Sequence, residues 1–177
     1  MIGTGIGGAL VVDGQVYRGA AGIAGEIGHM PMVLSRGKLC PCGRRGCIEA
    51  YASGRAISSL YAQRTQSDRI SVAAIAERAR AGEALARNVL SGAGHALGMA
   101  LGGLLNTLNP DVIVLGGGVL QAEELFLMPL QRGMRRQALP AMLAASVLRR
   151  MELEQDAVLI GAALLASQRA SAGGQTG

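Results

Sequence analysis

Aromatic residues are nearly absent from this sequence of 177 residues. It has no Trp, three Tyr and one Phe, so that aromatic side chains make up 2% of the chain. This scarcity argues against a nucleic-acid surface on which bases stack against aromatic rings. Charged residues are also few, at 16%, whereas apolar residues reach 50%. Such a composition is typical of a soluble globular domain with a hydrophobic core and argues against a disordered chain.

Targeting and membrane-spanning signals are missing as well. Residues 1–12 lack the charged start and the cleavage site of a signal peptide. Residues 89–110 contain no Asp, Glu, Lys or Arg, but they include polar side chains and many glycines. A spanning helix needs about 20 predominantly apolar residues. We therefore interpret this stretch as a buried helix and expect a cytoplasmic protein without a membrane segment.

The net charge of +5 gathers in short arginine groups. The members of these groups are Arg44, Arg45, Arg132, Arg135, Arg136, Arg149 and Arg150. The groups are typical of solvated faces and loop ends, or they attract an anionic ligand such as a nucleotide. None of them forms a capped basic helix of the kind that reads DNA.

Apolar periodicity and turn residues predict an α/β protein. Asp13-Gly14 between two β-prone runs, residues 9–12 and 15–18, predicts a hairpin. Residues 29–34 are short and apolar, as expected for another strand. Two further strands are predicted at residues 111–115 and 143–148, and the first of these should be buried on both faces of a parallel sheet.

Helices are predicted around these strands. One turn is expected at residues 48–51, a second helix is capped by Ser53 or Ser58 and ends near residue 64, and Ser71 caps a third at residues 72–81. Longer helices are expected at residues 83–108, 123–139 and 157–167. Residues 170–177 are predicted to form a disordered tail.

Three glycines recur every four residues in the longest of these helices. Gly94, Gly98 and Gly102 form a stripe without side chains, although each glycine costs a helix roughly 1 kcal/mol relative to alanine. Such a stripe indicates the close approach of another backbone. The partner is expected within the same chain or across a dimer.

The three cysteines lie close together, as Cys40-Pro-Cys42-Gly-Arg-Arg-Gly-Cys47. An odd number cannot pair fully within one chain, and so tight a cluster suits a metal better than disulfides. Zinc takes four tetrahedral nitrogen or sulfur ligands, and His29 is the expected fourth ligand. His95, the only other histidine, is interpreted as a buried or partly buried helix residue.

Four protein ligands make a closed, structural zinc site with no open position for a catalytic water. The metal is therefore expected to organise its neighbours, and the candidates are Glu26 and Glu49 on either side of the cluster. A fixed pair of carboxylates suits the vicinal hydroxyls of a polyol. The spacing equally allows a simpler role, in which Glu49 favours a helix N-terminus through the macrodipole.

Two glycine segments are candidate nucleotide contacts. In residues 3–8, Gly-Thr-Gly-Ile-Gly-Gly, backbone amides and the Thr4 hydroxyl can face a phosphate. The segment leads into a hairpin and no Gly-Lys-Ser/Thr follows, so it is neither a dinucleotide fingerprint nor a P-loop. An actin-like ATPase loop fits better. Residues 116–118, three glycines after a strand, either seat a purine nucleoside or form a tight turn.

Together these residues resemble the ROK family, named for repressors, open reading frames and kinases. Residues 25–29 match its Gly-Glu-x-Gly-His element, and residues 40–49 match its Cys-x-Cys-Gly-x-x-Gly-Cys-x-Glu signature throughout. Residues 3–8 resemble its second phosphate loop, and residues 112–118 resemble its adenosine-side strand and glycine turn. The resemblance implies an α/β, actin-like ATPase (ribonuclease H-like) C-terminal lobe over residues 1–169, with a zinc loop at residues 29–49.

The resemblance also implies roles for individual residues. Structural zinc would be bound by His29, Cys40, Cys42 and Cys47. A hexose or N-acylhexosamine would be bound by Glu26, His29 and Glu49. ATP, accompanied by Mg²⁺, would be bound by Thr4, Gly5, Gly7, Gly117 and Gly118. The family also leads us to expect a homodimer.

One part of the family pattern does not occur in this sequence. Kinases of the family carry an Asp-x-Gly-Gly-Thr loop and an Asn-Asp pair, whose Asp is the general base for the sugar hydroxyl, and neither is present. We therefore expect an N-terminal lobe outside this chain, no catalytic residue within it, and no kinase activity of the chain alone. The alternatives are a sugar-sensing repressor, which would bind nucleic acid through a further domain, and a non-catalytic zinc-stapled interaction domain.

Overall fold

The computed structural model describes residues 1–33, 35–153 and 156–173. Its strands are β1 (Leu10–Val12), β2 (Gln15–Tyr17), β3 (Val112–Leu115) and β4 (Val147–Arg150). Its α-helices are α1 (Glu49–Ala52), α2 (Gly54–Thr65), α3 (Val72–Arg80), α4 (Ala84–Leu108), α5 (Glu123–Gln137), α6 (Pro140–Ala145) and α7 (Ala157–Gly173). Two 3-10 helices are η1 (Ile27–His29) and η2 (Gly118–Ala122). These elements confirm the prediction of an α/β protein.

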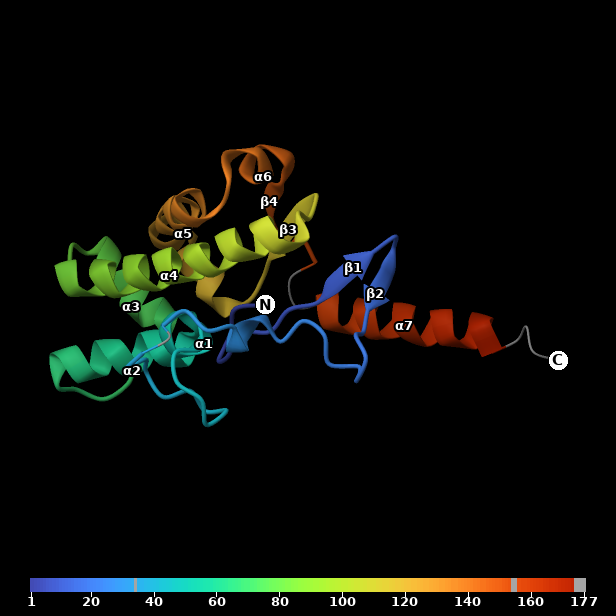
Figure 1. The fold of residues 1–177 in the computed structure, drawn as a ribbon. Coiled ribbons are helices and arrows are strands. Elements are labelled where there is room, and N and C mark those ends of the chain that lie inside the picture. Colours follow the sequence, from blue (N-terminus) through green and yellow to red (C-terminus); the bar gives the residue numbers. More distant parts are fainter. Residues whose placement is uncertain (34, 154–155, 174–177) are drawn as a thin grey trace.

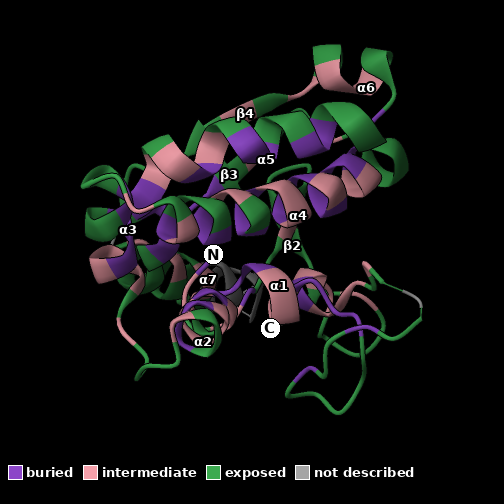
Figure 2. Ribbon diagram, turned by 90° about the vertical axis from the view of Figure 1, so that its left-hand side faces the viewer, coloured by how far each residue is buried: buried purple, intermediate pink, exposed green. Residues whose placement is uncertain are grey.

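Helix α4 is the centre of the molecule and separates two helical layers (Figure 1). Helices α5 and α6 lie on one side of it, and α1, α2 and α3 lie on the other. Buried residues recur along the whole length of α4 (Figure 2), among them Leu90, Leu97 and Leu105. The single long helix predicted from leucine spacing is confirmed. Its leucines lie at helical spacing and contact both layers.

The glycine stripe of α4 packs against α5 of the same chain. A Cβ atom added at Gly94 or Gly98 would overlap backbone carbonyls of α5, and one at Gly102 would lie 2.7 Å from a side-chain carbon of α5. Helix α5 contributes Gly133, where an added Cβ would overlap the carbonyl of His95. The predicted close approach is confirmed and is internal. The expected homodimer stays a prediction.

Serine side chains begin two of the helices below α4. The Ser53 hydroxyl accepts the backbone N–H of Ala56 at 3.1 Å, and the Ser71 hydroxyl accepts that of Ala74 at 3.1 Å. Of the two caps considered for α2, the structure therefore uses Ser53. Ser58 lies inside α2 and donates its hydroxyl to the carbonyl of Ile70. Each such cap satisfies an amide that would otherwise lack a helical partner.

The predicted hairpin is confirmed as an antiparallel pair, β1 and β2, with Leu10 opposite Tyr17. Its two loop residues, Asp13 and Gly14, both have positive φ, at 51° and 74°. Two positive φ values are characteristic of the turn that best follows the twist of a hairpin, and Asp-Gly is among the sequences that adopt it most readily.

Strand β3 pairs in parallel with β4, but the prediction that it is buried on both faces is wrong. Val112 and Val114 are 47% and 54% exposed. The alternate residues, Ile113 and Leu115, contact the hydrophobic core. Successive side chains of a strand point to opposite faces, and the described residues cover only one of them.

The strand predicted at residues 143–148 is wrong in its first half. Pro140 begins helix α6, which continues to Ala145, and β4 starts only at Val147. Proline at the first helical position has a φ suited to a helix, and the alanines that follow favour helical backbone. The local helix therefore displaces the extended conformation that the apolar pattern indicated.

Helix α7 projects away from the other helices (Figure 1) and continues to Gly173. The predicted disordered tail is therefore wrong for residues 170–173, where alanine and serine extend the helix. Residues 174–177 lie outside the described part of the chain. Val158 and Leu159 of α7 are 68% and 72% exposed. Among the described residues, no helix combines the length and the apolar character required to cross a bilayer.

Candidate functional site

The four predicted metal ligands come together at one point. One ligand atom from each of His29, Cys40, Cys42 and Cys47 lies within 4.8 Å of the others. The Sγ atoms of Cys42 and Cys47 are 3.7 Å apart, and Nδ1 of His29 lies 3.7 Å from Sγ of Cys40. A disulfide would need about 2.05 Å between sulfurs, and all three cysteines are free.

These separations fit a tetrahedral zinc ion. With Zn–S bonds of about 2.3 Å, a regular tetrahedron places two sulfur ligands about 3.8 Å apart, and a Zn–N bond of about 2.05 Å gives roughly 3.6 Å between nitrogen and sulfur. Both values agree with the 3.7 Å separations in the structure. Three sulfurs and one imidazole nitrogen are also the donor set of a structural site.

Backbone hydrogen bonds and two glycines shape residues 29–49, which we call the zinc loop after the metal that its side chains are predicted to bind. The N–H of Cys40 donates to the carbonyl of Arg44 at 2.8 Å, and Gly43 N–H donates back to Cys40 at 2.9 Å. Gly43 and Gly46 both have φ of 86°, a backbone conformation that residues with a side chain rarely adopt. A Cβ atom at Gly46 would also overlap the carbonyl of Val33. The Cys-Gly spacing thus produces a narrow turn around the ligands.

The strand predicted at residues 29–34 is wrong within the described residues, and Leu34 lies outside them. His29 ends the 3-10 helix η1, and Pro31 forms only an isolated bridge with Cys47. The chain is held by single hydrogen bonds, from Met32 N–H to Gly46 at 2.7 Å and from Ile48 N–H to Met30 at 2.9 Å. Proline has no amide to donate and therefore interrupts a ladder.

Burial and hydrogen bonding shift the pKa values of Cys42 and Cys47 in opposite directions. Cys40 and Cys47 are buried and Cys42 is exposed. Burial raises the pKa of Cys47 to about 12, whereas the pKa of Cys42 is lowered, chiefly by a hydrogen bond from the Arg44 backbone amide. Metal ligation requires the thiolate form. A cation within the cluster would supply the charge that the buried Cys47 thiolate needs.

His29 has one ring nitrogen for the cluster and one for Glu26. Its Nδ1 faces Cys40, and its Nε2 lies 3.7 Å from a carboxylate oxygen of Glu26, one turn earlier in the chain. Glu26 itself is 64% exposed. A metal-bound histidine commonly uses its second nitrogen for a carboxylate or for another outer partner. This arrangement leaves the Glu26 carboxylate accessible beside the cluster.

Glu49 begins helix α1, two residues after Cys47, and its carboxylate is turned toward residues 3–8, which we call the glycine loop. One carboxylate oxygen, Oε2, accepts the backbone N–H of Ile6 at 2.9 Å. Neither interpretation of Glu49 from the sequence, as a sugar ligand or as a residue that favours a helix N-terminus, includes this contact with the glycine loop. Glu49 lies at a helix start and also connects the zinc loop to the glycine loop.

The second glycine segment contacts Ile2, the residue immediately before the glycine loop. Ile2 N–H donates to the carbonyl of Gly116 at 2.7 Å, and Val119 N–H donates to that of Ile2 at 3.1 Å. Gly117 has φ of 107°, and a Cβ there would lie 2.5 Å from the Ile2 carbonyl. The turn therefore requires glycine for its own packing. The Gly7 amide donates to the carbonyl of Met1, just before the glycine loop, at 3.1 Å.

Thr4 and Gly118 line one cavity of about 560 Å³. The rest of its wall includes Arg55 at the start of α2, Arg69 before α3 and Gln121 in η2. The described lining residues include no carboxylate. No sequence pattern marks these three residues, because they come from separate elements and share no local motif.

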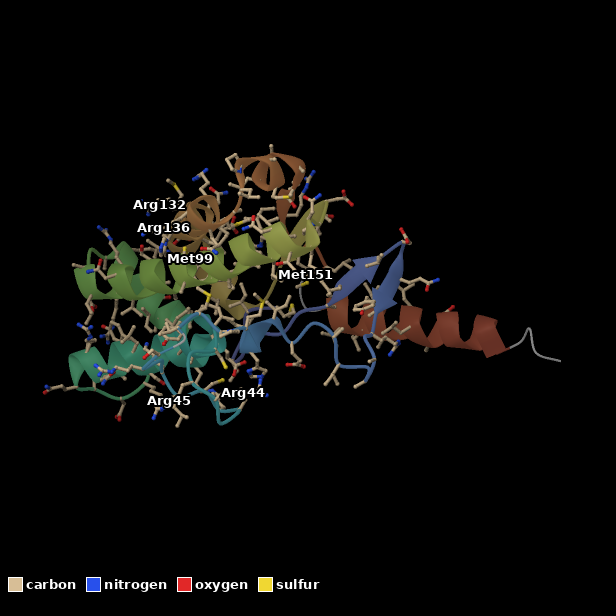
Figure 3. All side chains as sticks on the ribbon, in the orientation of Figure 1. Arg44, Arg45, Met99, Arg132, Arg136 and Met151 are labelled. Atoms are coloured by element: carbon tan, nitrogen blue, oxygen red, sulfur yellow. The ribbon has the colours of Figure 1, made fainter. Side chains whose placement is uncertain are left out.

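A second cavity of about 290 Å³ lies beside the same glycine turn. Gly116 and Gly117 line it together with Met151 and Val158. In Figure 3, Met151 lies where the strands meet the start of α7, whereas Arg44 and Arg45 lie at the outer edge of the zinc loop. Arg132 and Arg136 gather on the outer side of α5 (Figure 3). Arg44, Arg45, Arg132 and Arg136 are solvent-exposed and line neither cavity. Arg150 of the remaining group lines the 290 Å³ cavity and donates to a carboxylate oxygen of Glu123 at 2.9 Å.

Comparison with known proteins identifies the family. The model of the ROK family matches residues 1–169. A glucokinase of Halalkalibacterium halodurans is 33% identical over 95% of this chain and 55% of its own length. A xylose repressor of Bacillus subtilis is 35% identical over 71% of this chain and 32% of its own length.

Solved structures agree with the sequence relatives. A ROK hexokinase from Thermus thermophilus superimposes with a TM-score of 0.86 at 36% identity, covering 96% of this chain and 56% of that one. A ROK glucokinase from Streptomyces griseus, solved with glucose and AMPPNP, has a TM-score of 0.83 at 33% identity, covering 94% and 59%. The fold is that of the actin-like ATPases, and the chain belongs to the ROK family. It spans about half the length of the curated relatives it matches.

Proposed function

We propose that this chain forms the C-terminal, zinc-containing half of a carbohydrate kinase that transfers the γ-phosphate of ATP to a hexose or N-acylhexosamine. One observation carries the proposal: Thr4 of the glycine loop and Gly118 of the distant glycine turn line the same cavity. Glu49 connects that glycine loop to the metal cluster through Ile6. A phosphate site and a polyol site would therefore be adjacent, as phosphoryl transfer requires.

The proposed roles follow the positions of the side chains. Glu26, His29 and Glu49 would accept or donate hydrogen bonds to sugar hydroxyls, because two carboxylates and an imidazole offer several convergent polar atoms. Thr4 and Gly5 would face the phosphates of ATP with its Mg²⁺. Gly7, Gly117 and Gly118 would complete the nucleotide contacts, with Gly117 near the adenosine. The chemical base would come from outside this chain.

Zinc in this proposal is structural. His29, Cys40, Cys42 and Cys47 would hold it, and a full protein ligand set leaves no position for a reacting water. The ion would cross-link the zinc loop and neutralise the buried thiolates. The other donors near it, Glu26 and Glu49, remain available for a ligand.

A sugar-sensing repressor is the second candidate, because xylose repressors are among the relatives at 34–36% identity. A structural relative described as a ROK transcriptional regulator has a TM-score of 0.75 and covers 84% of this chain. A repressor needs the sugar site but no phosphate site. The open cavity beside Thr4 and the absence of acidic residues from its described lining favour a kinase.

The first test uses the zinc-loaded chain and isothermal titration with D-glucose, N-acetyl-D-glucosamine and ATP. We expect saturable binding of ATP and of one of the sugars, and no labelled sugar phosphate with γ-labelled ATP. Sugar binding without ATP binding would favour the repressor. Binding of none of the three would contradict both candidates, and phosphorylation by the chain alone would show that it contains its own base.

A second prediction concerns Arg55, which lines the cavity beside Thr4. Arg55→Ala should weaken ATP binding about three- to tenfold, since an exposed guanidinium–phosphate contact is worth roughly 1 kcal/mol. Adenosine, which lacks phosphates, should bind the variant as it binds the wild type. Arg64→Ala is the matched control, because Arg64 is exposed in the same helix and does not line that cavity. Equal ATP affinities for both variants would remove Arg55 from the site.

A further inference from the structure

Ile6 of the glycine loop is held from two sides by the segments that carry the candidate sugar ligands. Its backbone N–H donates to Oε2 of Glu49 at 2.9 Å. Its carbonyl is packed so closely against Gly28 that a Cβ there would overlap it. Ile6 is also 7% exposed, so its amide has little access to water as an alternative partner. A buried amide without a partner is costly.

Gly5 shows how closely Glu49 fits the loop. A Cβ atom at Gly5 would lie 2.5 Å from Oε2 and 3.2 Å from Cδ of Glu49. Its φ lies outside the left-handed region, because Gly5 is not among the glycines with positive φ. Glycine is therefore needed here for space and not for backbone conformation. The carboxylate occupies the position that any side chain at residue 5 would take.

We propose that Glu49 is a positioning residue for the glycine loop, so that binding of a sugar at the zinc loop and binding of phosphates at the glycine loop reinforce each other. This inference rests on the proposed function. Among the described contacts, one oxygen of Glu49 is used by Ile6, and the other can accept a sugar hydroxyl. A sugar that fixes the carboxylate also fixes the Ile6 amide and, with it, the neighbouring Thr4 and Gly5.

The coupling must be reciprocal. If a bound sugar raises the affinity for ATP, then bound ATP raises the affinity for the sugar by the same factor. The two ligands need no direct contact, because both favour the same conformation of residues 4–6. The size of the coupling between the two ligands depends on how much the glycine loop moves when no sugar is bound to Glu49.

The first experiment needs no ligand. Hydrogen exchange of the Ile6 amide is measured by NMR in the zinc-loaded chain. Exchange should accelerate about tenfold or more in Glu49→Ala and in Gly5→Ala, because a bond to a charged acceptor is lost. Glu49→Gln should retain protection, since its amide oxygen can accept the same N–H. Gly3→Ala is the matched control in the loop, because its added methyl meets no atom within 4 Å.

The second experiment measures ATP affinity with and without saturating D-glucose. Wild type should bind ATP about fivefold more tightly with glucose, a coupling at the lower end of the usual range. Glu49→Ala and Gly5→Ala should reduce that ratio to one, and Gly5→Ala should weaken glucose binding although residue 5 lies in the other loop. Gly3→Ala should bind glucose as the wild type does.

The two proposals fail in different ways. Equal exchange of the Ile6 amide in wild type and Glu49→Ala would overturn the positioning role, whatever the ligands do. A wild-type chain that protects the Ile6 amide but binds neither glucose nor ATP would overturn the proposed function instead. Binding of both ligands without coupling would overturn the reinforcement.

Discussion

Cys42→Ser is expected to abolish stoichiometric zinc binding and to lower the free energy of unfolding by about 3 kcal/mol or more, because binding of a structural zinc ion is coupled to folding. Cys42 is the informative ligand, since it is exposed whereas Cys40 and Cys47 are buried. Its replacement by serine removes the sulfur without creating a cavity. Metal content by mass spectrometry and thermal unfolding with and without a chelator measure the effect.

The control lies in the same turn. Arg44→Ser changes an exposed side chain and leaves all four ligands in place. Its backbone amide, which hydrogen-bonds the Cys42 sulfur, is also retained. This variant should bind one zinc ion and unfold as the wild type does. A Cys42→Ser variant that kept the same stability and the same sugar affinity would refute the structural role of zinc.

Gly98→Ala is expected to destabilise the protein by about 3 kcal/mol, because overpacking against a backbone forces two elements apart. The added methyl would overlap the backbone carbonyl of Leu130 in α5. Neither backbone can relax by a change of rotamer. Chemical denaturation, with the midpoint and the slope fitted separately, would measure the loss.

Gly92→Ala is the matched substitution in the same helix. Gly92 is exposed, and a methyl group there meets no atom within 4 Å. The variant should gain roughly 0.5–1 kcal/mol from helix propensity. If Gly98→Ala lowers the free energy of unfolding and Gly92→Ala raises it, the glycine stripe is required for the packing of α5. A stable Gly98→Ala variant would contradict the tight packing of α4 against α5.

Features encoded by neighbouring residues were predictable from the sequence. The cysteine cluster with His29, the Asp13-Gly14 hairpin and the Ser71 cap all depend on short spacing, and the structure has each of them in the predicted place. The glycine stripe was also correctly read as a close contact, because a helix tolerates such glycines only for packing. The stripe does not identify α5 as its partner, since a row of glycines carries no information about which element packs against it.

Contacts between distant segments were not predictable. The bond between Glu49 and Ile6 joins residues 43 positions apart, and the cavity beside Thr4 is completed by Arg55 and Arg69 from other elements. No periodic pattern in the sequence predicts a contact between such distant segments. The exposure of Val114 is not predictable for a similar reason, because an apolar run does not reveal how many neighbouring elements will cover a strand.

The short spacing of the metal ligands has a consequence for the order of folding. All four ligands lie between residues 29 and 47, so that closing this loop costs little chain entropy. By contrast, the pairing of β3 with β4 and the contact between Glu49 and Ile6 must close loops about twice as long. Contacts of low sequence separation form fastest. In the presence of zinc, the zinc loop is therefore expected to fold early. The glycine loop is expected to pack against it later.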